Sequence, residues 1–103
     1  MTTQVTPVAG PNTFITTGGV SVIAIFPNPN GGYITNPLTA ADQGIGTAEP
    51  LYVDPVGSCS VLQANTTTFA LPPGETWNVI PGQTTPTFVN AATNGHKFTA
   101  VSF

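Results

Sequence analysis

Charged side chains are almost missing from this sequence. They make up 5% of its 103 residues, whereas about 25% is typical of soluble domains. Lys97 is the only Lys or Arg residue, and the sequence contains four carboxylates, Asp42, Glu49, Asp54 and Glu75. Phosphate binding needs several Lys or Arg contacts, so a nucleic-acid partner is excluded, and an anionic membrane surface is excluded for the same reason. With so little charge repulsion to oppose association, the composition favours a protein that works in an assembled state.

Cysteine pairs, long apolar runs and the residue pattern of a secretory signal peptide are also lacking in the sequence. Cys59 is the only cysteine, which excludes an internal disulfide and a cysteine-rich secreted scaffold. The longest apolar stretch, residues 20–26, ends at Pro27 and is too short to span a bilayer. Residues 1–7 show neither the basic nor the apolar region of a signal peptide. Synthesis in a cytoplasm, without a cleaved signal, is therefore expected.

Glycine and proline are abundant instead, with eleven of each, and β-branched and aromatic residues fill the short intervals between them. This spacing predicts a single all-β domain of about eight short antiparallel strands, a β-sandwich of jelly-roll type with a small β-barrel as the alternative. A Pro- and Gly-rich N-terminal arm is expected over residues 1–12, and the sandwich over residues 13–103. The expected strands cover residues 13–17, 20–26, 33–35, 51–54, 66–71, 76–80, 87–93 and 97–103.

Three local patterns make sharper predictions. Residues 20–26 are apolar on both faces, which favours a central or sandwiched strand. Residues 38–43 are expected to form one helical turn that ends at Gly44. Asn94-Gly95 favours the positive φ angles of a tight turn, so the last two strands are predicted to form a hairpin.

The residues that could carry chemistry are few and scattered. His96 lacks the further ligands that zinc needs, so it is interpreted as structural or solvent-exposed, with a metal or acid–base role as the alternative. Cys59 is interpreted as a small buried residue, since nothing around it in the sequence would stabilise a thiolate for catalysis with His96 as base. Turn capping explains Asp54 and Glu75 better than a glycosidase pair does. No catalytic residue, metal site or cofactor is predicted, and the chain is not expected to be an enzyme.

Apolar and aromatic side chains suggest binding surfaces instead. Trp77 and Val79 share a strand face, so the Trp77 ring is expected to point into the sandwich. An alternative is a sugar-binding platform built from Trp77, Tyr33 and Tyr52. In the last strand Phe98 and Ala100 point one way and Val101 and Phe103 the other, which indicates a second contact surface. The expected interface residues, two from the arm and two from the last strand, are Val5, Val8, Val101 and Phe103.

Several motifs resemble small virion structural proteins of tailed bacteriophages. They are the run Leu51-Tyr52-Val53-Asp54-Pro55, the run Pro73-Gly74-Glu75-Thr76-Trp77 and the terminal segment 95–101, within a resemblance that covers residues 49–101. The similarity is to capsid decoration (cement) and head-fibre proteins. That family is commonly a compact β-sandwich on the capsid surface, often a trimer, and it offers no active site to transfer.

The resemblance implies a decoration protein that bridges major capsid subunits and stabilises their contacts. Its expected partners are the major capsid protein and further copies of itself in a homotrimer. Its expected location is the virion surface after synthesis in a host cytoplasm. Alternative roles are another virion component (a head fibre, tail tube or tail-tip protein) and, in a different class, a carbohydrate-binding module.

Overall fold

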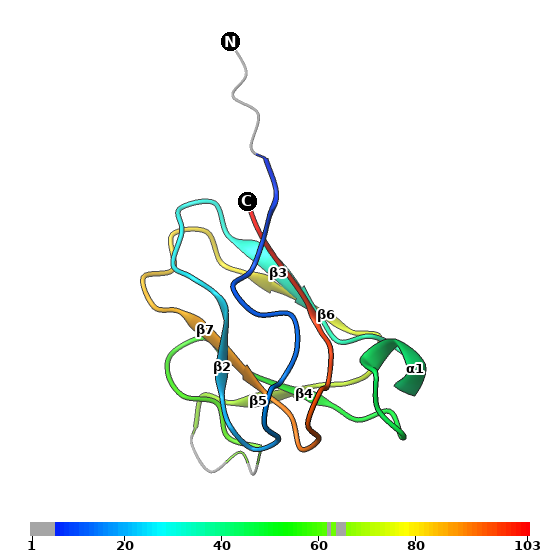
Figure 1. Cartoon of the computed structure of the whole chain (residues 1–103). Helices are drawn as coiled ribbons and strands as arrows, with labels where there is room; N and C mark the ends of the chain where they lie inside the picture. Colours follow the sequence, from blue (N-terminus) through cyan, green and yellow to red (C-terminus); the bar gives the residue numbers. More distant parts are fainter. Residues whose placement is uncertain (1–5, 62, 64–65) are drawn as a thin grey trace.

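The computed structural model describes residues 6–61, 63 and 66–103 and shows a small β-sandwich of two four-stranded antiparallel sheets (Figure 1). We call the sheet with strand order β1-β8-β3-β6 sheet I and the sheet with order β2-β7-β4-β5 sheet II. This is the strand order of an eight-stranded jelly roll, so the predicted fold class is confirmed. The elements are β1 (Val8–Ala9), β2 (Val22–Ile25), β3 (Gly32–Thr35), α1 (Ala40–Gln43), β4 (Leu51–Asp54), β5 (Phe69–Leu71), β6 (Thr76–Val79), β7 (Thr87–Asn90) and β8 (Thr99–Ser102).

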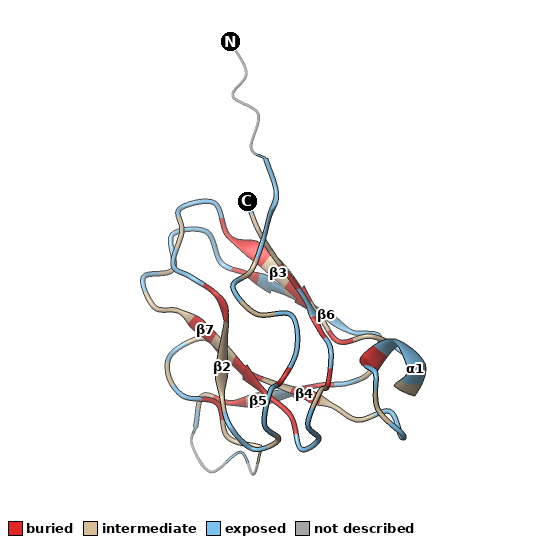
Figure 2. Cartoon of the chain, in the orientation of Figure 1, coloured by how far each residue is buried: buried red, intermediate tan, exposed pale blue. Residues whose placement is uncertain are grey.

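The core lies between the two sheets and is made by the alternating residues of their facing sides. Ile34 is fully buried in β3, between Ala100 of β8 and Trp77 of β6. Val53 of β4 lies beside Val89 of β7 in the other sheet, and both are fully buried. Figure 2 shows buried segments on the strands of both layers and exposed residues along most connections. Burial of each such side chain contributes about 1.5–3 kcal/mol, which makes this layer the main source of stability.

The predicted helical turn is confirmed. The Thr39 hydroxyl accepts a hydrogen bond from the Asp42 amide at the start of α1, and Gly44 ends the helix at φ 75°. A residue with a side chain is strained in that left-handed conformation, whereas glycine is not. The Lys97 amide donates to the carbonyl of Gln43. This bond holds the helix against the segment that leads into β8.

The N-terminal part of the chain differs from the prediction. Residues 13–17 form no strand, and only an isolated bridge joins Phe14 to Lys97. Residues 8–9, inside the expected arm, pair with β8 as β1. A Cβ atom on Gly10 would collide with the carbonyl oxygen of Ala24 in β2, so glycine allows the chain to pass closely between the two sheets at this point.

Residues 20–26 were expected to form a central or sandwiched strand, and the central position is wrong, because β2 is an edge strand of sheet II. Its apolar character on both faces has a different cause. The segment that contains Gly10 and Asn12 runs along β2, and the Asn12 amide donates to the carbonyl of Ile23 at 2.8 Å. The edge is therefore covered by the chain itself, as an apolar edge strand requires.

The predicted terminal hairpin is also wrong. β7 pairs with β2 and β4, whereas β8 pairs with β1 and β3, so the last two strands belong to different sheets. Gly95 does adopt the positive φ expected of the Asn-Gly turn, at 82°. However, its amide donates to the carbonyl of Ile15, and Ile15 donates to the carbonyl of His96. Pairing with this earlier segment replaces the hairpin ladder, and the turn becomes a crossover between the sheets.

The outward sides of the two sheets differ. On sheet II, Asp54 and Asn90 occupy outward positions in register with Phe88 and Tyr52, yet both are fully buried. The connection between β4 and β5 covers them, because Asn90 donates to the carbonyl of Cys59 and Asp54 accepts from Val56, Gly57, Thr67 and Thr68. The strand residues of sheet I gain no comparable cover from a connection within the described chain.

Candidate functional site

The outward side of sheet I is an uncharged surface with an apolar end. The strand register places Tyr33 beside Val101 on this side. Phe103 continues the same alternation beyond β8, and its ring centroid lies 5.9 Å from that of Tyr33. Ile80 continues the alternation beyond β6 and is 67% exposed. We call Tyr33, Ile80, Val101 and Phe103 the sheet I patch. Strands β1, β3, β6 and β8 contain no charged residue, so this side offers only apolar and neutral polar contacts.

The three expected interface residues that the structure describes do not form one surface. Val101 and Phe103 lie together in the sheet I patch. Val8 pairs with Ser102, so its side chain is directed to the opposite side of the sheet from Val101. Val5 lies outside the described residues. The sequence pattern did not reveal Tyr33 as the neighbour of Val101, or Ile80 as a residue on the same side of the sheet, because these positions depend on β6, β3 and β8 lying side by side.

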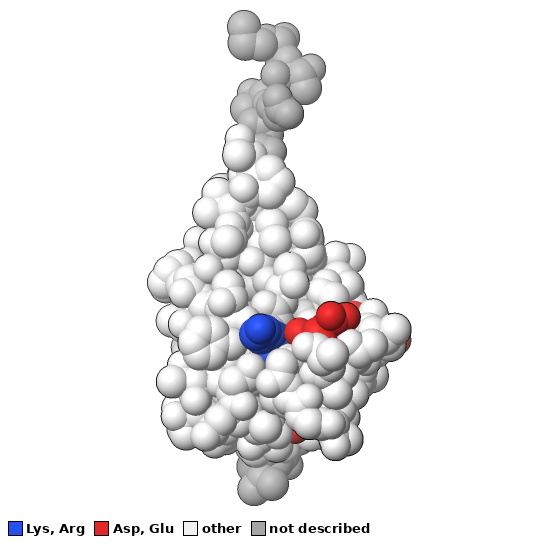
Figure 3. Space-filling model, turned by 45° about the vertical axis from the view of Figure 1, so that its right-hand side comes forward, with Lys and Arg blue, Asp and Glu red and all other residues white. Residues whose placement is uncertain are grey.

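The charged residues lie away from the patch, in connections and at strand ends. Figure 3 shows a nearly uncharged face on which the one blue region, Lys97, lies close to a red acidic region. The Lys97 side chain is exposed, and its aliphatic carbons lie beside Gly44. In the described part of the chain no group of three His, Cys, Asp or Glu residues is arranged to hold a metal ion.

His96 is a fully buried residue at the centre of a hydrogen-bonded polar cluster. Its side chain is 0% exposed, its Nδ1 lies 2.9 Å from Glu49 Oε1, and its Nε2 lies 2.8 Å from Asn36 Oδ1. Gln43 from α1 also bonds to Asn36, and Thr93 donates to both carboxylate oxygens of Glu49. We call Asn36, Gln43, Glu49, Thr93 and His96 the polar cluster. The histidine is therefore structural, and the solvent-exposed alternative is wrong.

Cys59 is buried, as predicted, and has little reactivity. Desolvation by burial raises the pKa of its thiol to about 12, so the nucleophilic thiolate is scarce near neutral pH. Both ring nitrogens of His96 are engaged with Asn36 and Glu49. His96 is thus not free to activate the thiol as a base. A Cys–His nucleophile does not fit this geometry.

Asp54 caps the turn that follows β4, which confirms the turn-capping interpretation. Oδ1 accepts hydrogen bonds from the amides of Val56 and Gly57, and Oδ2 accepts from the hydroxyls of Thr67 and Thr68. Burial by itself raises the pKa of this carboxyl, but the four hydrogen bonds together outweigh it and leave the pKa below its ordinary value. The ionised form therefore stabilises the connection that covers sheet II.

We expect Asp54→Asn to lower the free energy of unfolding by about 1–2 kcal/mol near neutral pH, because an amide replaces one oxygen that accepts two hydrogen bonds. The lowered pKa in the folded state means that the carboxylate's contribution is present above its unfolded value of about 3.9 and is lost as the pH falls through the lower folded value. Urea unfolding at about pH 7 and about pH 2 measures this. The difference in the free energy of unfolding between Asp54→Asn and the native protein should be smaller at about pH 2 than at about pH 7. The control is Asp42→Asn, at an exposed carboxylate, which should have the same free energy of unfolding as the native protein at both pH values.

The three aromatic residues of the carbohydrate alternative lie on different surfaces. Trp77 faces the core, and its ring centroid lies 5.5 Å from that of Phe69 in β5. Tyr33 is on the outward side of sheet I, and Tyr52 is on the outward side of sheet II. The predicted inward orientation of Trp77 is confirmed, and the three rings do not build one sugar-stacking platform.

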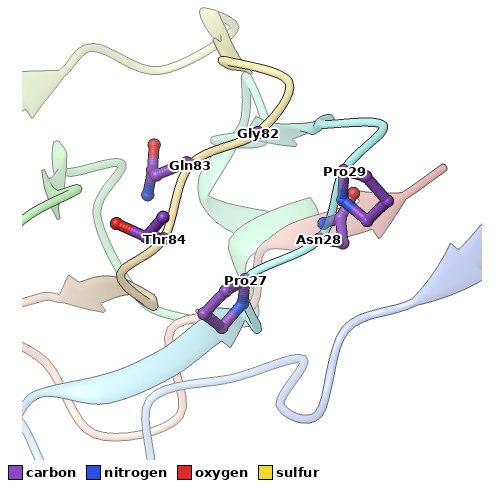
Figure 4. A pocket seen from close by; sticks show the side chains of 6 residues that line it. All are labelled: Pro27, Asn28, Pro29, Gly82, Gln83 and Thr84. Carbon is purple, nitrogen blue, oxygen red and sulfur yellow. The ribbon is translucent and has the colours of Figure 1, made fainter.

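A shallow hollow of about 410 Å³ lies between the β2–β3 and β6–β7 connections. Figure 4 shows Pro27, Asn28 and Pro29 from the first connection and Gly82, Gln83 and Thr84 from the second. The Gln83 side-chain amide donates to Pro55, Thr85 and Thr87, and Asn28 bonds within its own turn. With no charged residue in its lining and these two amides engaged, the hollow has little means of binding a polar ligand.

No helix in the described residues has the length and apolar character needed to cross a membrane. Comparisons with family models, with curated proteins and with solved structures found no match to this chain.

Proposed function

We propose that the chain is a capsid decoration protein of a tailed bacteriophage, and that it binds the outer capsid surface through the sheet I patch. In this role it adds buried area across contacts between major capsid subunits and so stabilises the shell. The proposal includes no catalytic step, metal or cofactor. It locates the protein on the virion after synthesis in the host cytoplasm.

The observation that carries the proposal is the difference between the two outward faces. On sheet II the connection between β4 and β5 buries the outward residues Asp54 and Asn90, whereas sheet I leaves Ile80 67% and Phe103 40% exposed on the same side as Tyr33 and Val101. Contiguous exposed apolar side chains on a small domain mark an interaction surface. Because no charge lies on these strands, a partner with a neutral surface can bind there without leaving a buried charge unpaired.

The low charge and the fold give further support. With one Lys against four carboxylates, electrostatic repulsion between copies is weak, which suits a protein present in many copies on one shell. We therefore include a homotrimer in the proposal. Jelly rolls occur in viral capsid proteins but also in lectin domains, so the fold alone does not assign the function. The separated aromatic rings favour the virion role over sugar binding.

The test is binding to expanded, undecorated capsids of the phage that encodes the chain, measured by co-sedimentation. Ile80→Asn and Phe103→Ser are each expected to weaken binding at least tenfold, because a buried apolar side chain contributes about 1.5–3 kcal/mol and about 1.4 kcal/mol corresponds to a factor of ten. Val56→Asn is the matched control, since Val56 is 60% exposed on the far side of the sandwich.

Three results would contradict the proposal. Failure of the native protein to bind the capsids would make a different virion part the better hypothesis. Binding of the Ile80 and Phe103 variants as tight as that of the Val56 variant would place the contact on another surface. Specific glycan binding with no capsid binding would support a carbohydrate-binding module.

A further inference from the structure

The side-chain amides in the polar cluster have only one satisfactory orientation. Asn36 Nδ2 donates to the carbonyls of Glu49 and Leu71 at 3.0 and 2.9 Å. Gln43 Nε2 lies within hydrogen-bond distance of Asn36 Oδ1 and of the carbonyl oxygens of Pro37 and Glu49. Gln43 Oε1 accepts a hydrogen bond from the Glu49 backbone amide. Turning either amide around would set oxygen against oxygen or nitrogen against N–H. Asn36 Oδ1 is therefore an acceptor, and it receives the bond from Gln43 Nε2.

This orientation fixes the protons on His96. Its Nε2 faces Asn36 Oδ1 at 2.8 Å, so Nε2 must donate and carry a proton. Its Nδ1 faces Glu49 Oε1 at 2.9 Å, and that oxygen already accepts from the Thr93 amide. A hydrogen bond at this distance needs one more proton, either on Nδ1 beside a carboxylate or on Oε1 beside a neutral ring.

We propose that the folded protein holds one proton between His96 and Glu49, and that this proton fastens the crossover between β7 and β8 to the 36–50 connection. Without it, the Nδ1 lone pair and a carboxylate oxygen would face each other in a site where the ring has no access to water. Rising pH thus loosens this end of the sandwich. The inference rests on the geometry of the polar cluster and does not depend on the proposed function.

Within the part of the chain that the structure describes, no hydrogen bond or ion pair joins another charged side chain to this pair. Asp42 on α1 and Glu75 before β6 have exposed side chains, as does Lys97, the residue that follows His96. Among the described residues, Asp42, Glu75 and Lys97 take part in no ion pair. Further hydrogen bonds join the His96 and Glu49 side chains to the neutral residues Asn36 and Thr93.

The sign of the pH effect follows from counting protons. In the unfolded chain a free carboxylate and a free histidine release their protons near about pH 4.3 and about pH 6.5. Above about pH 6.5 the folded pair therefore holds a proton that the unfolded pair does not. The contribution is fully present below that pH, and as the pH rises further the unfolding equilibrium constant increases, by up to tenfold per pH unit.

The first experiment is ¹⁵N and ¹³C NMR on the native protein at about pH 7.5. His96 is the only histidine, so its ring signals are unambiguous. Two protonated ring nitrogens, or a protonated Nε2 together with a protonated Glu49 carboxyl, would support the proposal. A neutral ring beside an ionised Glu49 in the folded protein would overturn it.

The second experiment measures urea unfolding between about pH 6.5 and about pH 7.5, where Cys59 of the unfolded chain, with a pKa of about 8.5, is still mostly protonated. The native protein should show a rising unfolding constant, and Glu49→Gln should lose this dependence. Glu75→Gln removes an exposed carboxylate of the same kind, and this variant should retain the pH dependence of the native protein. An equal pH dependence in all three proteins would overturn the proposal. If Glu49→Gln does not fold, the NMR result on the native protein decides.

Discussion

Replacing Asn36 by alanine is expected to lower the free energy of unfolding by about 3–5 kcal/mol. Its side chain is fully buried and makes four hydrogen bonds, to the carbonyls of Glu49 and Leu71 and to the side chains of Gln43 and His96. A buried polar group that loses its partner costs about 1–3 kcal/mol. The substitution leaves several such groups in one place, so the loss is a large share of the stability of a small domain.

Urea unfolding of Asn36→Ala at fixed pH measures this loss. Asn78→Ala is the matched control, because Asn78 is an exposed asparagine on β6; its substitution should change the stability by less than about 0.5 kcal/mol. If the two variants were equally stable, the hydrogen bonds of the polar cluster would not hold the fold together.

Trp77→Ala is the second large effect, with an expected loss of about 3 kcal/mol and a melting temperature lower by roughly 15 °C. The ring packs against the core and against Phe69 at the side of the sandwich where β5 and β6 approach each other. Trp77 is only partly buried, so the expected loss is near the lower end of the range for buried aromatic residues. The variant leaves a cavity between the sheets that they cannot close without shifting.

Thermal unfolding followed by circular dichroism is the measurement. Phe26→Ala is the aromatic control, since Phe26 is 57% exposed, and it should shift the melting temperature by no more than a few degrees. A Trp77→Ala protein as stable as the native one, but deficient in glycan binding, would show that the ring serves a ligand rather than the core.

The fold class could be predicted from the sequence because its signals are local. Proline and glycine end each short run, and β-branched residues between them leave little choice but strands. The bounds of β4 agree with the expected strand at residues 51–54, since Pro50 and Pro55 stand on either side of it. The turn at α1 was predictable for the same reason, with Gly44 providing the left-handed cap.

The candidate binding face was predictable only in part. The alternation of the last strand predicted that Val101 and Phe103 face away from Phe98 and Ala100, which are buried. It could not show that Ile80 and Tyr33 join them. It also could not show that the Val8 side chain lies on the opposite side of the sheet from Val101, which results from the pairing of Val8 with Ser102.

The sequence by itself determined the all-β character, the near absence of charge and the short lengths of the strands, because each depends on residue type or on neighbouring residues. The tertiary structure alone decided that β7 and β8 enter different sheets. The Asn-Gly turn is compatible with a hairpin or a crossover, and pairing of residues 13–18 with residues 91–98 selects the crossover. The tertiary structure also decided the role of His96, because its partners Asn36 and Glu49 are 60 and 47 residues away in the chain. Their hydrogen bonds exist only after the two sheets have packed.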